Sequence, residues 1–136
     1  MALEPIGWPA YDFKSKVAKI LVIDDDEVLR EYAAECLRGV GHEVLTAEDG
    51  ETGVALAAAE RPDVVVTDVM MPGMFGFAVV HVLRENPTLA KTRIIISSLN
   101  FHADPEGVRS SGADRFLPKP YAPEALVGMV AELLKS

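Results

Sequence analysis

The sequence predicts an α/β fold in which a parallel sheet is covered by helices on both faces. Apolar runs of strand length alternate with segments whose apolar residues recur at helical spacing. Several of these runs, such as "KILVI" and "RIIIS", are almost purely aliphatic. Strands that are apolar on both sides are typical of a parallel sheet buried between helices, because an antiparallel sheet usually leaves one face in water.

The first half of this alternation contains three strands and two helices. We expect strands at 18–24, 43–47 and 63–68, and helices at 27–40 and 50–60. Gly41 follows the first helix and is a typical residue just beyond a helix end. Pro62 stops the second helix, because proline lacks the N–H group that a continuing helix needs.

The second half contains three helices and two strands. We expect helices at 75–85, 104–112 and 122–136, and strands at 93–97 and 115–119. In the second of these helices, Asp104 is the predicted cap, Pro105 the first helical residue and Gly112 the stop. In the last helix, Leu126 and Val130 lie on one predicted apolar face.

Five strands alternating with five helices lead to a specific topology. Because crossovers between parallel strands are right-handed, few doubly wound orders are possible, and the common one is the flavodoxin-like order 2-1-3-4-5. Its ligand crevice lies at the carboxyl ends of strands one and three. Residues 1–17 have no clear period and contain Pro5 and Pro9, so we interpret them as an irregular N-terminal extension. Residues 18–136 are predicted to form one domain.

Composition narrows the classes of partner. The formal net charge of −8 argues against nucleic acid or an anionic membrane as the direct partner. The single cysteine, Cys36, excludes an internal disulfide and is predicted to pack in the core. No apolar stretch approaches the ~20 residues of a membrane span. We therefore expect a cytoplasmic protein without membrane insertion.

Polar side chains follow four of the predicted strands. Because the carboxyl ends of parallel strands meet at one edge of a sheet, these side chains should lie in one crevice. Strand one ends at the acidic pair, strand three at a third aspartate, strand four at two serines and strand five at a lysine. The residues are Asp24, Asp25, Asp68, Ser97, Ser98 and Lys119.

Close carboxylates at a strand end are unfavourable unless a cation neutralises them. All candidate ligands are oxygens, which favours Mg²⁺ over zinc. A carboxylate beside Mg²⁺ can attack a phosphoryl group, and Lys119 can neutralise a phosphoryl oxygen. The crevice is thus predicted to hold phosphate on Asp68. Part of the run of three aspartates also has a simpler interpretation, because Asp25 or Asp26 can serve as a helix cap.

Three segments give the chain a family resemblance. "KILVIDDDEVLR", "PDVVVTDVMMPGMFG" and "GADRFLPKP", in this order and spacing, resemble the receiver domain of two-component response regulators. The resemblance covers residues 18–135. It implies a signalling domain rather than an enzyme with its own substrate, although such a domain catalyses its own phosphotransfer and autodephosphorylation.

The resemblance also implies roles for individual residues. Asp68 would accept phosphate from a histidine kinase or a histidine phosphotransfer protein. Mg²⁺ would be held by Asp25, by Asp24 largely through water, by Asp68, and by the backbone carbonyl of Met70. Lys119 would contact the phosphoryl group, and the bond from Lys119 to Pro120 would be cis.

A switch is implied as well. The spacing to the "GAD" segment selects Ser97 rather than Ser98 as the switch hydroxyl, and Phe116 as the switch aromatic. Their movement would repack the surface of the fourth helix, fifth strand and fifth helix, where a downstream protein target binds. The contact face expected there includes Tyr121, and a homodimer is left open.

Three residues depart from the commonest family pattern. Phe75 stands where an aspartate usually precedes the glycine. Met70 and Leu99 stand where other members often carry polar residues that position hydrolytic water. We therefore expect slow autodephosphorylation.

Two other functions compete with the switch. One is an aspartyl phosphatase of the haloacid dehalogenase type, which normally needs a second aspartate two residues after the nucleophile, where this chain has Met70. The other is a phosphorylation-independent interaction module that keeps a vestigial pocket.

Overall fold

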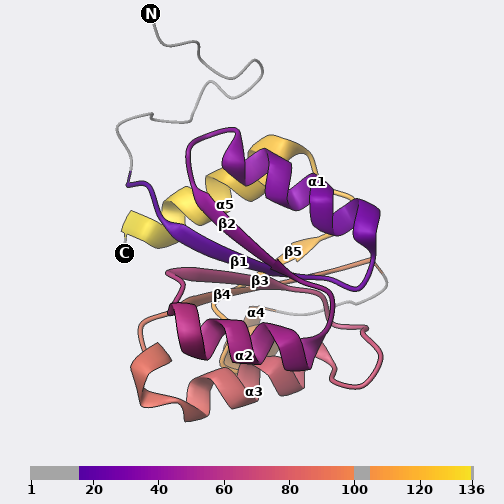
Figure 1. The fold of residues 1–136 in the computed structure, drawn as a ribbon, viewed down its shortest axis with the longest axis vertical. Coiled ribbons are helices and arrows are strands. Elements are labelled where there is room, and N and C mark those ends of the chain that lie inside the picture. Colours follow the sequence, from indigo (N-terminus) through magenta and orange to yellow (C-terminus); the bar gives the residue numbers. More distant parts are fainter. Residues whose placement is uncertain (1–15, 100–104, 136) are drawn as a thin grey trace, which may run out of the picture.

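One five-stranded parallel sheet organises the molecule, as seen in a computed structural model that describes residues 16–99 and 105–135. The strands are Lys19–Ile23 (β1), Glu43–Ala47 (β2), Val64–Thr67 (β3), Arg93–Ser98 (β4) and Arg115–Pro118 (β5). All four pairings are parallel, and the order is β2-β1-β3-β4-β5 (Figure 1). The predicted flavodoxin-like topology is confirmed.

The described residues form five α-helices, of which four connect successive strands and the fifth follows β5. They are Glu27–Arg38 (α1), Gly50–Glu60 (α2), Gly76–Glu85 (α3), Pro105–Ser110 (α4) and Pro123–Lys135 (α5). A short 3-10 helix at Pro87–Leu89 (η1) was not expected from the sequence. The Asn86 side chain caps it by accepting from the Thr88 N–H at 3.0 Å. None of the described helices combines the length and apolarity that a membrane span requires.

Two helices end earlier than predicted. α1 stops at Arg38 instead of residue 40, and the Gly39 N–H donates to the carbonyl of Glu35 as the helix ends. α4 ends at Ser110, slightly before the predicted stop Gly112, which follows with a positive φ of 99°. The predicted cap Asp104 lies outside the described residues, as do residues 1–15 of the predicted extension.

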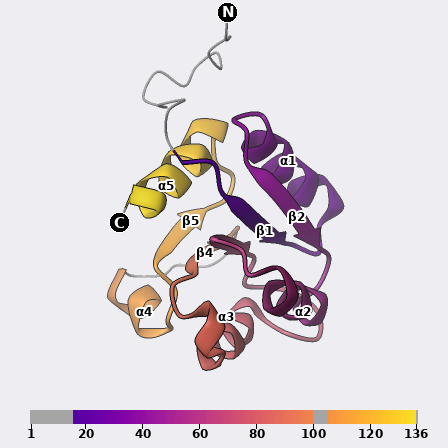
Figure 2. The same ribbon diagram turned by 60° about the vertical axis from the view of Figure 1, so that its left-hand side comes forward.

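Helices cover both faces of the sheet, as Figure 2 shows. Alternate residues of β1 point to opposite sides: Ile20 packs in the core with α1 and α5, whereas Leu21 packs in the core with α2 and α3. Cys36 is buried in the α1/α5 layer, so its predicted packing role is confirmed. Both faces of β1 and β3 are therefore apolar, which explains their continuous aliphatic sequences.

The start of α1 is fixed by one member of the acidic motif. Asp26 is the N-cap, and its Oδ1 accepts a hydrogen bond from the Leu29 N–H at 3.0 Å. The Asp26 N–H in turn donates to Oδ1 of Asp24 at 3.0 Å. Of the three consecutive aspartates, Asp26 thus has the structural role that the sequence allowed.

Candidate functional site

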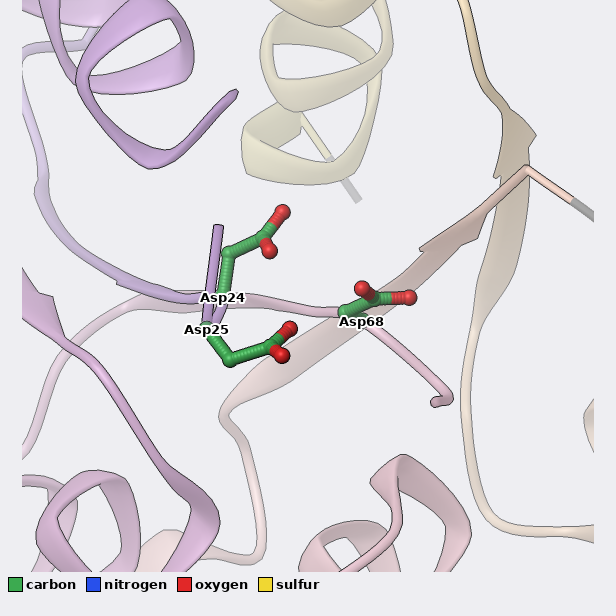
Figure 3. Close-up of side chains that lie close together, drawn as sticks. All are labelled: Asp24, Asp25 and Asp68. Atoms are coloured by element: carbon green, nitrogen blue, oxygen red, sulfur yellow. The ribbon is translucent and has the colours of Figure 1, made fainter. Parts of the chain in front are cut away.

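Three carboxylates meet where β1 and β3 end. Asp24 and Asp68 extend the sheet by one residue beyond these strands: the Asp68 N–H donates to the carbonyl of Ile23 at 3.0 Å, and the Asp24 N–H to that of Ala47 at 3.1 Å. One oxygen from each of Asp24, Asp25 and Asp68 lies within 4.8 Å of the others. Figure 3 shows the three carboxylates gathered around one space. The predicted convergence of these residues is observed.

Lys119 lies inside this acidic cluster. Its Nζ is 2.5 Å from Oδ2 of Asp24 and 3.5 Å from Oδ2 of Asp68. The side chains of Lys119 and Asp24 are only 5% and 6% exposed, so this charge pair is almost fully withdrawn from water. The lysine is held in place by β5, whose backbone continues the sheet through a hydrogen bond from the Lys119 N–H to the carbonyl of Ser98. The Lys119–Pro120 bond is cis, as expected.

The two oxygens of the Asp68 carboxylate lie in different environments. Its Oδ1 accepts from the Val69 N–H at 2.7 Å and from the Met70 N–H at 3.4 Å, whereas its Oδ2 faces Lys119. Burial raises the pKa of Asp68; the charge of Lys119 lowers it in part, and the charge of Asp24 raises it further. The Asp68 carboxylate is therefore partly desolvated and lies beside another negative charge, so a bound cation would stabilise its charged form.

The donor set fits a hard divalent ion. The three side chains gathered here supply only carboxylate oxygens, which suit Mg²⁺ and Ca²⁺ better than zinc. Mg²⁺ is usually bound by one or two carboxylates together with water and phosphate oxygens. Because Asp25 is exposed, one side of the cluster is open to such additional ligands.

A crevice of about 220 Å³ opens over Asp68. Its mouth is partly apolar: Met70 is 60% exposed and Leu99 57% exposed. Leu29 also lines it, which sequence reasoning did not predict, although Leu29 follows the cap Asp26 by one helical turn. The full lining is Asp25, Asp26, Leu29, Asp68, Met70, Ser98, Leu99 and Lys119.

The two serines of β4 lie in different environments. Ser98 lines the crevice beside Lys119. Ser97 is buried, and its Oγ has no hydrogen-bond partner among the described residues. Ser97 is paired with Leu117 in the sheet, and alternation along β4 places its side chain on the α1/α5 side, together with that of Ile95. Of the predicted site residues, Ser97 is close in sequence to the crevice but does not line it.

Phe116 lies on the other side of the sheet. It is half-buried against the core beneath α2, α3 and α4, and pairs with Ile96 across β4 and β5. It does not line the crevice. Tyr121 packs instead with the α1/α5 core, and its carbonyl accepts from the Tyr32 hydroxyl at 3.2 Å.

Comparison with known proteins identifies the same architecture elsewhere. Residues 20–131 match the family model described as the response regulator receiver domain. The chain is 36% identical over 119 residues to the protein PilH of Pseudomonas aeruginosa, covering 87% of this chain and 98% of PilH. The structure of the chemotaxis response regulator CheY4 of Vibrio cholerae matches with a TM-score of 0.80 and 33% identity, over 87% of this chain and 99% of CheY4.

Some relatives are much longer than the matched region. The "Probable transcriptional regulatory protein TcrX" of Mycobacterium tuberculosis is 38% identical over 117 residues, which are 85% of this chain. The chain spans 49% of the length of TcrX and 26% of the length of the response regulator PleD of Caulobacter vibrioides. What these proteins share with this chain is therefore one domain.

Proposed function

The chain belongs to the response regulator receiver domain family, and on that premise we propose that it is a phosphoacceptor switch. Asp68 takes a phosphoryl group from a histidine kinase or a histidine phosphotransfer protein. The phosphorylated domain then acts on a downstream protein target. The phosphotransfer takes place in the cytoplasm. The surface that changes on phosphorylation can also bind a second copy of the chain.

The observation that carries this proposal is the setting of Asp68. Asp24 and Asp25 lie on one side of its carboxylate and the Lys119 ammonium lies 3.5 Å away. Asp24, Asp25, Asp68 and the backbone carbonyl of Met70 are the groups proposed to hold Mg²⁺. The ion, when bound, supplies positive charge that offsets the carboxylates and the incoming phosphoryl oxygens.

The residues of the chain position the reaction. A carboxylate oxygen of Asp68 forms a bond to phosphorus as the bond from phosphorus to the donor histidine nitrogen breaks, and that nitrogen keeps the electron pair. The Val69 N–H fixes the carboxylate orientation at 2.7 Å. Lys119 moves from Asp24 toward a phosphoryl oxygen, where its ammonium neutralises charge that develops during transfer.

Ser97 is the proposed switch hydroxyl. Its Oγ is buried and has no hydrogen-bond partner in the described part of the chain, and a phosphoryl oxygen on Asp68 would supply one. Phe116, half-buried on the opposite side of β5, then turns inward and changes the surface presented to the target. Ser98 already lines the crevice and is the competing candidate.

Phosphorylation by a small donor tests the acceptor. Incubation with Mg²⁺ and acetyl phosphate should add one phosphoryl mass to the intact chain, and Asp68→Asn should abolish it. Asp49→Asn is the matched control, because Asp49 caps α2 away from the crevice and asparagine caps equally well. Phosphorylation that persists in Asp68→Asn would refute the assignment. No phosphorylation of the natural chain would favour an interaction module that works without phosphate.

A second measurement distinguishes Ser97 from Ser98 as the switch hydroxyl. Beryllofluoride with Mg²⁺ should shift the backbone amide signals of β5 and α5 in the natural chain. Ser97→Ala should lose most of that shift while still binding beryllofluoride, and Ser98→Ala should retain it. The opposite pattern would assign the switch to Ser98.

A further inference from the structure

A second pocket lies at the opposite edge of the sheet from Asp68. It has a volume of about 670 Å³ and is formed where the parallel strands begin. Its walls come from the loop before β3, the loop before β4, the C-terminal end of α5 and the residue Lys16. Figure 1 shows the start of β1 and the end of α5 on the same side of the molecule. The pocket shares no residue with the phosphorylation crevice.

The charge of this pocket is opposite to that of the protein. Four cationic side chains line it, and one carboxylate, in a chain whose net charge is −8. The cations are Lys16, Arg61, Lys91 and Arg93, and the carboxylate is Asp63. Asp63 Oδ2 accepts from the Lys19 N–H at 2.8 Å, so part of its acceptor capacity is already used within the fold.

Three of the four cations have no side-chain partner within residues 16–99 and 105–135. The side chains of Lys16, Arg61 and Lys91 form no hydrogen bond or ion pair with any described residue. Arg93 has a long contact of 3.7 Å with Asp114, a carboxylate that also accepts from Arg84 at 3.1 Å. Like charges gathered without partners repel one another, and an anion in the pocket would relieve that repulsion.

The pocket also has an apolar wall. Pro62 and Leu133 are buried, and Leu134 is half-buried, and all three contribute to the lining. The volume lies within the range of small-molecule sites. Guanidinium groups bind phosphate through paired hydrogen bonds, and ammonium groups bind it as point charges. The combination of cations and an apolar wall suits an anion that also carries an apolar or aromatic part.

We propose that this pocket is a binding site for a phosphorylated small molecule of nucleotide size. The phosphates contact Arg61, Lys91 and their neighbours, and the apolar part of the ligand lies against Pro62 and Leu133. This inference goes beyond the proposed function, because it concerns a separate site and does not require phosphorylation of Asp68.

Titration of the full chain tests the proposal. ATP and tripolyphosphate are the probes, with EDTA present to remove divalent ions and with constant ionic strength. Both should cause saturable shifts in the amide signals of Arg61, Lys91 and Thr92, and ATP should bind more tightly because only ATP can use the apolar wall. Arg61→Gln combined with Lys91→Gln should weaken ATP binding about tenfold or more.

A charge-matched variant is the control. Arg109→Gln combined with Lys135→Gln removes the same charge from exposed positions that do not line the pocket, and should leave ATP affinity within about twofold. The proposal is overturned if neither probe saturates, if ATP binds no tighter than tripolyphosphate, or if both double variants lose affinity equally. Shifts confined to the crevice near Asp68 would also overturn it.

Discussion

Gly76 lies directly against the backbone carbonyl of Asp68. A Cβ atom added at Gly76 would stand 2.1 Å from that oxygen and 2.9 Å from the carbonyl carbon. The Gly76 N–H also donates to the carbonyl of Val69 at 2.8 Å, which ties the start of α3 to the segment that follows the acceptor. The glycine is required here because the backbone approaches closely, and this approach fixes the position of the acceptor.

The first prediction concerns that contact. Gly76→Ala should lower the free energy of unfolding by about 1–3 kcal/mol, because backbone must move to admit the methyl group. It should also reduce phosphorylation by acetyl phosphate, since Asp68 is displaced. Gly128→Ala is the control, because an added Cβ there meets nothing within 4 Å and alanine favours a helix. Chemical denaturation of the two variants measures the change in stability. Equal stability of Gly76→Ala and Gly128→Ala would contradict the contact.

Phe75 is the basis of the second prediction. It occupies the N-cap of α3 in an extended conformation, makes no side-chain capping bond, and is 56% exposed. Phe75→Asp should therefore raise the free energy of unfolding by about 1 kcal/mol, because an aspartate at the N-cap can accept a hydrogen bond from a backbone N–H in the first turn of α3. Phe75→Ala removes the ring without supplying a cap and should give no such gain. If both variants changed stability alike, capping would not be the cause.

The third prediction concerns the lifetime of the phosphoryl group. The exposed side chains of Met70 and Leu99 line the crevice and cannot hydrogen-bond a hydrolytic water. Met70→Asn combined with Leu99→Gln should shorten the phosphoryl half-life about tenfold, since a positioned polar group assists water attack. Loss of phosphoryl mass with time measures this.

A matched substitution separates the local effect from general polarity. Val28 is 76% exposed and does not line the crevice, so Val28→Asn should leave the half-life unchanged. An unaltered half-life in the Met70/Leu99 double variant would refute the expectation of slow autodephosphorylation.

His42 is the basis of the fourth prediction. It is buried, and its Nδ1 accepts a hydrogen bond from the Ala18 N–H at 3.0 Å, which requires the neutral ring with its proton on Nε2. Burial lowers the pKa of His42 below its ordinary 6.5, and Asp63 raises it in part. Below about pH 6.5 the unfolded chain therefore takes up a proton that the folded chain resists. The free energy of unfolding should fall as the pH drops through this region.

Substitution isolates that proton. His42→Asn retains an acceptor near Ala18 but cannot titrate, so its urea unfolding midpoint should depend less on pH between about 7 and 5. The control is His81→Asn, which makes the same substitution at a histidine whose side chain is 74% exposed. An unchanged pH dependence in His42→Asn would contradict the assignment.

The fold was largely predictable because its signals are local. Aliphatic runs mark β1, β3 and β4, and capping or helix-breaking residues such as Asp26 and Pro62 mark helix ends. The acidic cluster was predictable for a related reason, since the end of a parallel strand has a known place in the fold. The extra helix η1 and the early ends of α1 and α4 were missed, because short-range capping bonds decide them.

The amino-acid order alone determined which chemical groups meet at this edge of the sheet: Asp24, Asp25, Asp68 and Lys119 follow strands whose parallel order leaves no other edge for them. Only the tertiary structure decided which of these groups contact one another. Lys119 lies closer to Asp24 than to Asp68, and Ser98 rather than Ser97 lines the crevice. The tertiary structure alone also assembled the cationic pocket, from loops that carry no common motif. The physical reason is range: strand and helix signals act between neighbours in the chain, whereas hydrogen bonds and charge contacts depend on side chains that only packing brings together.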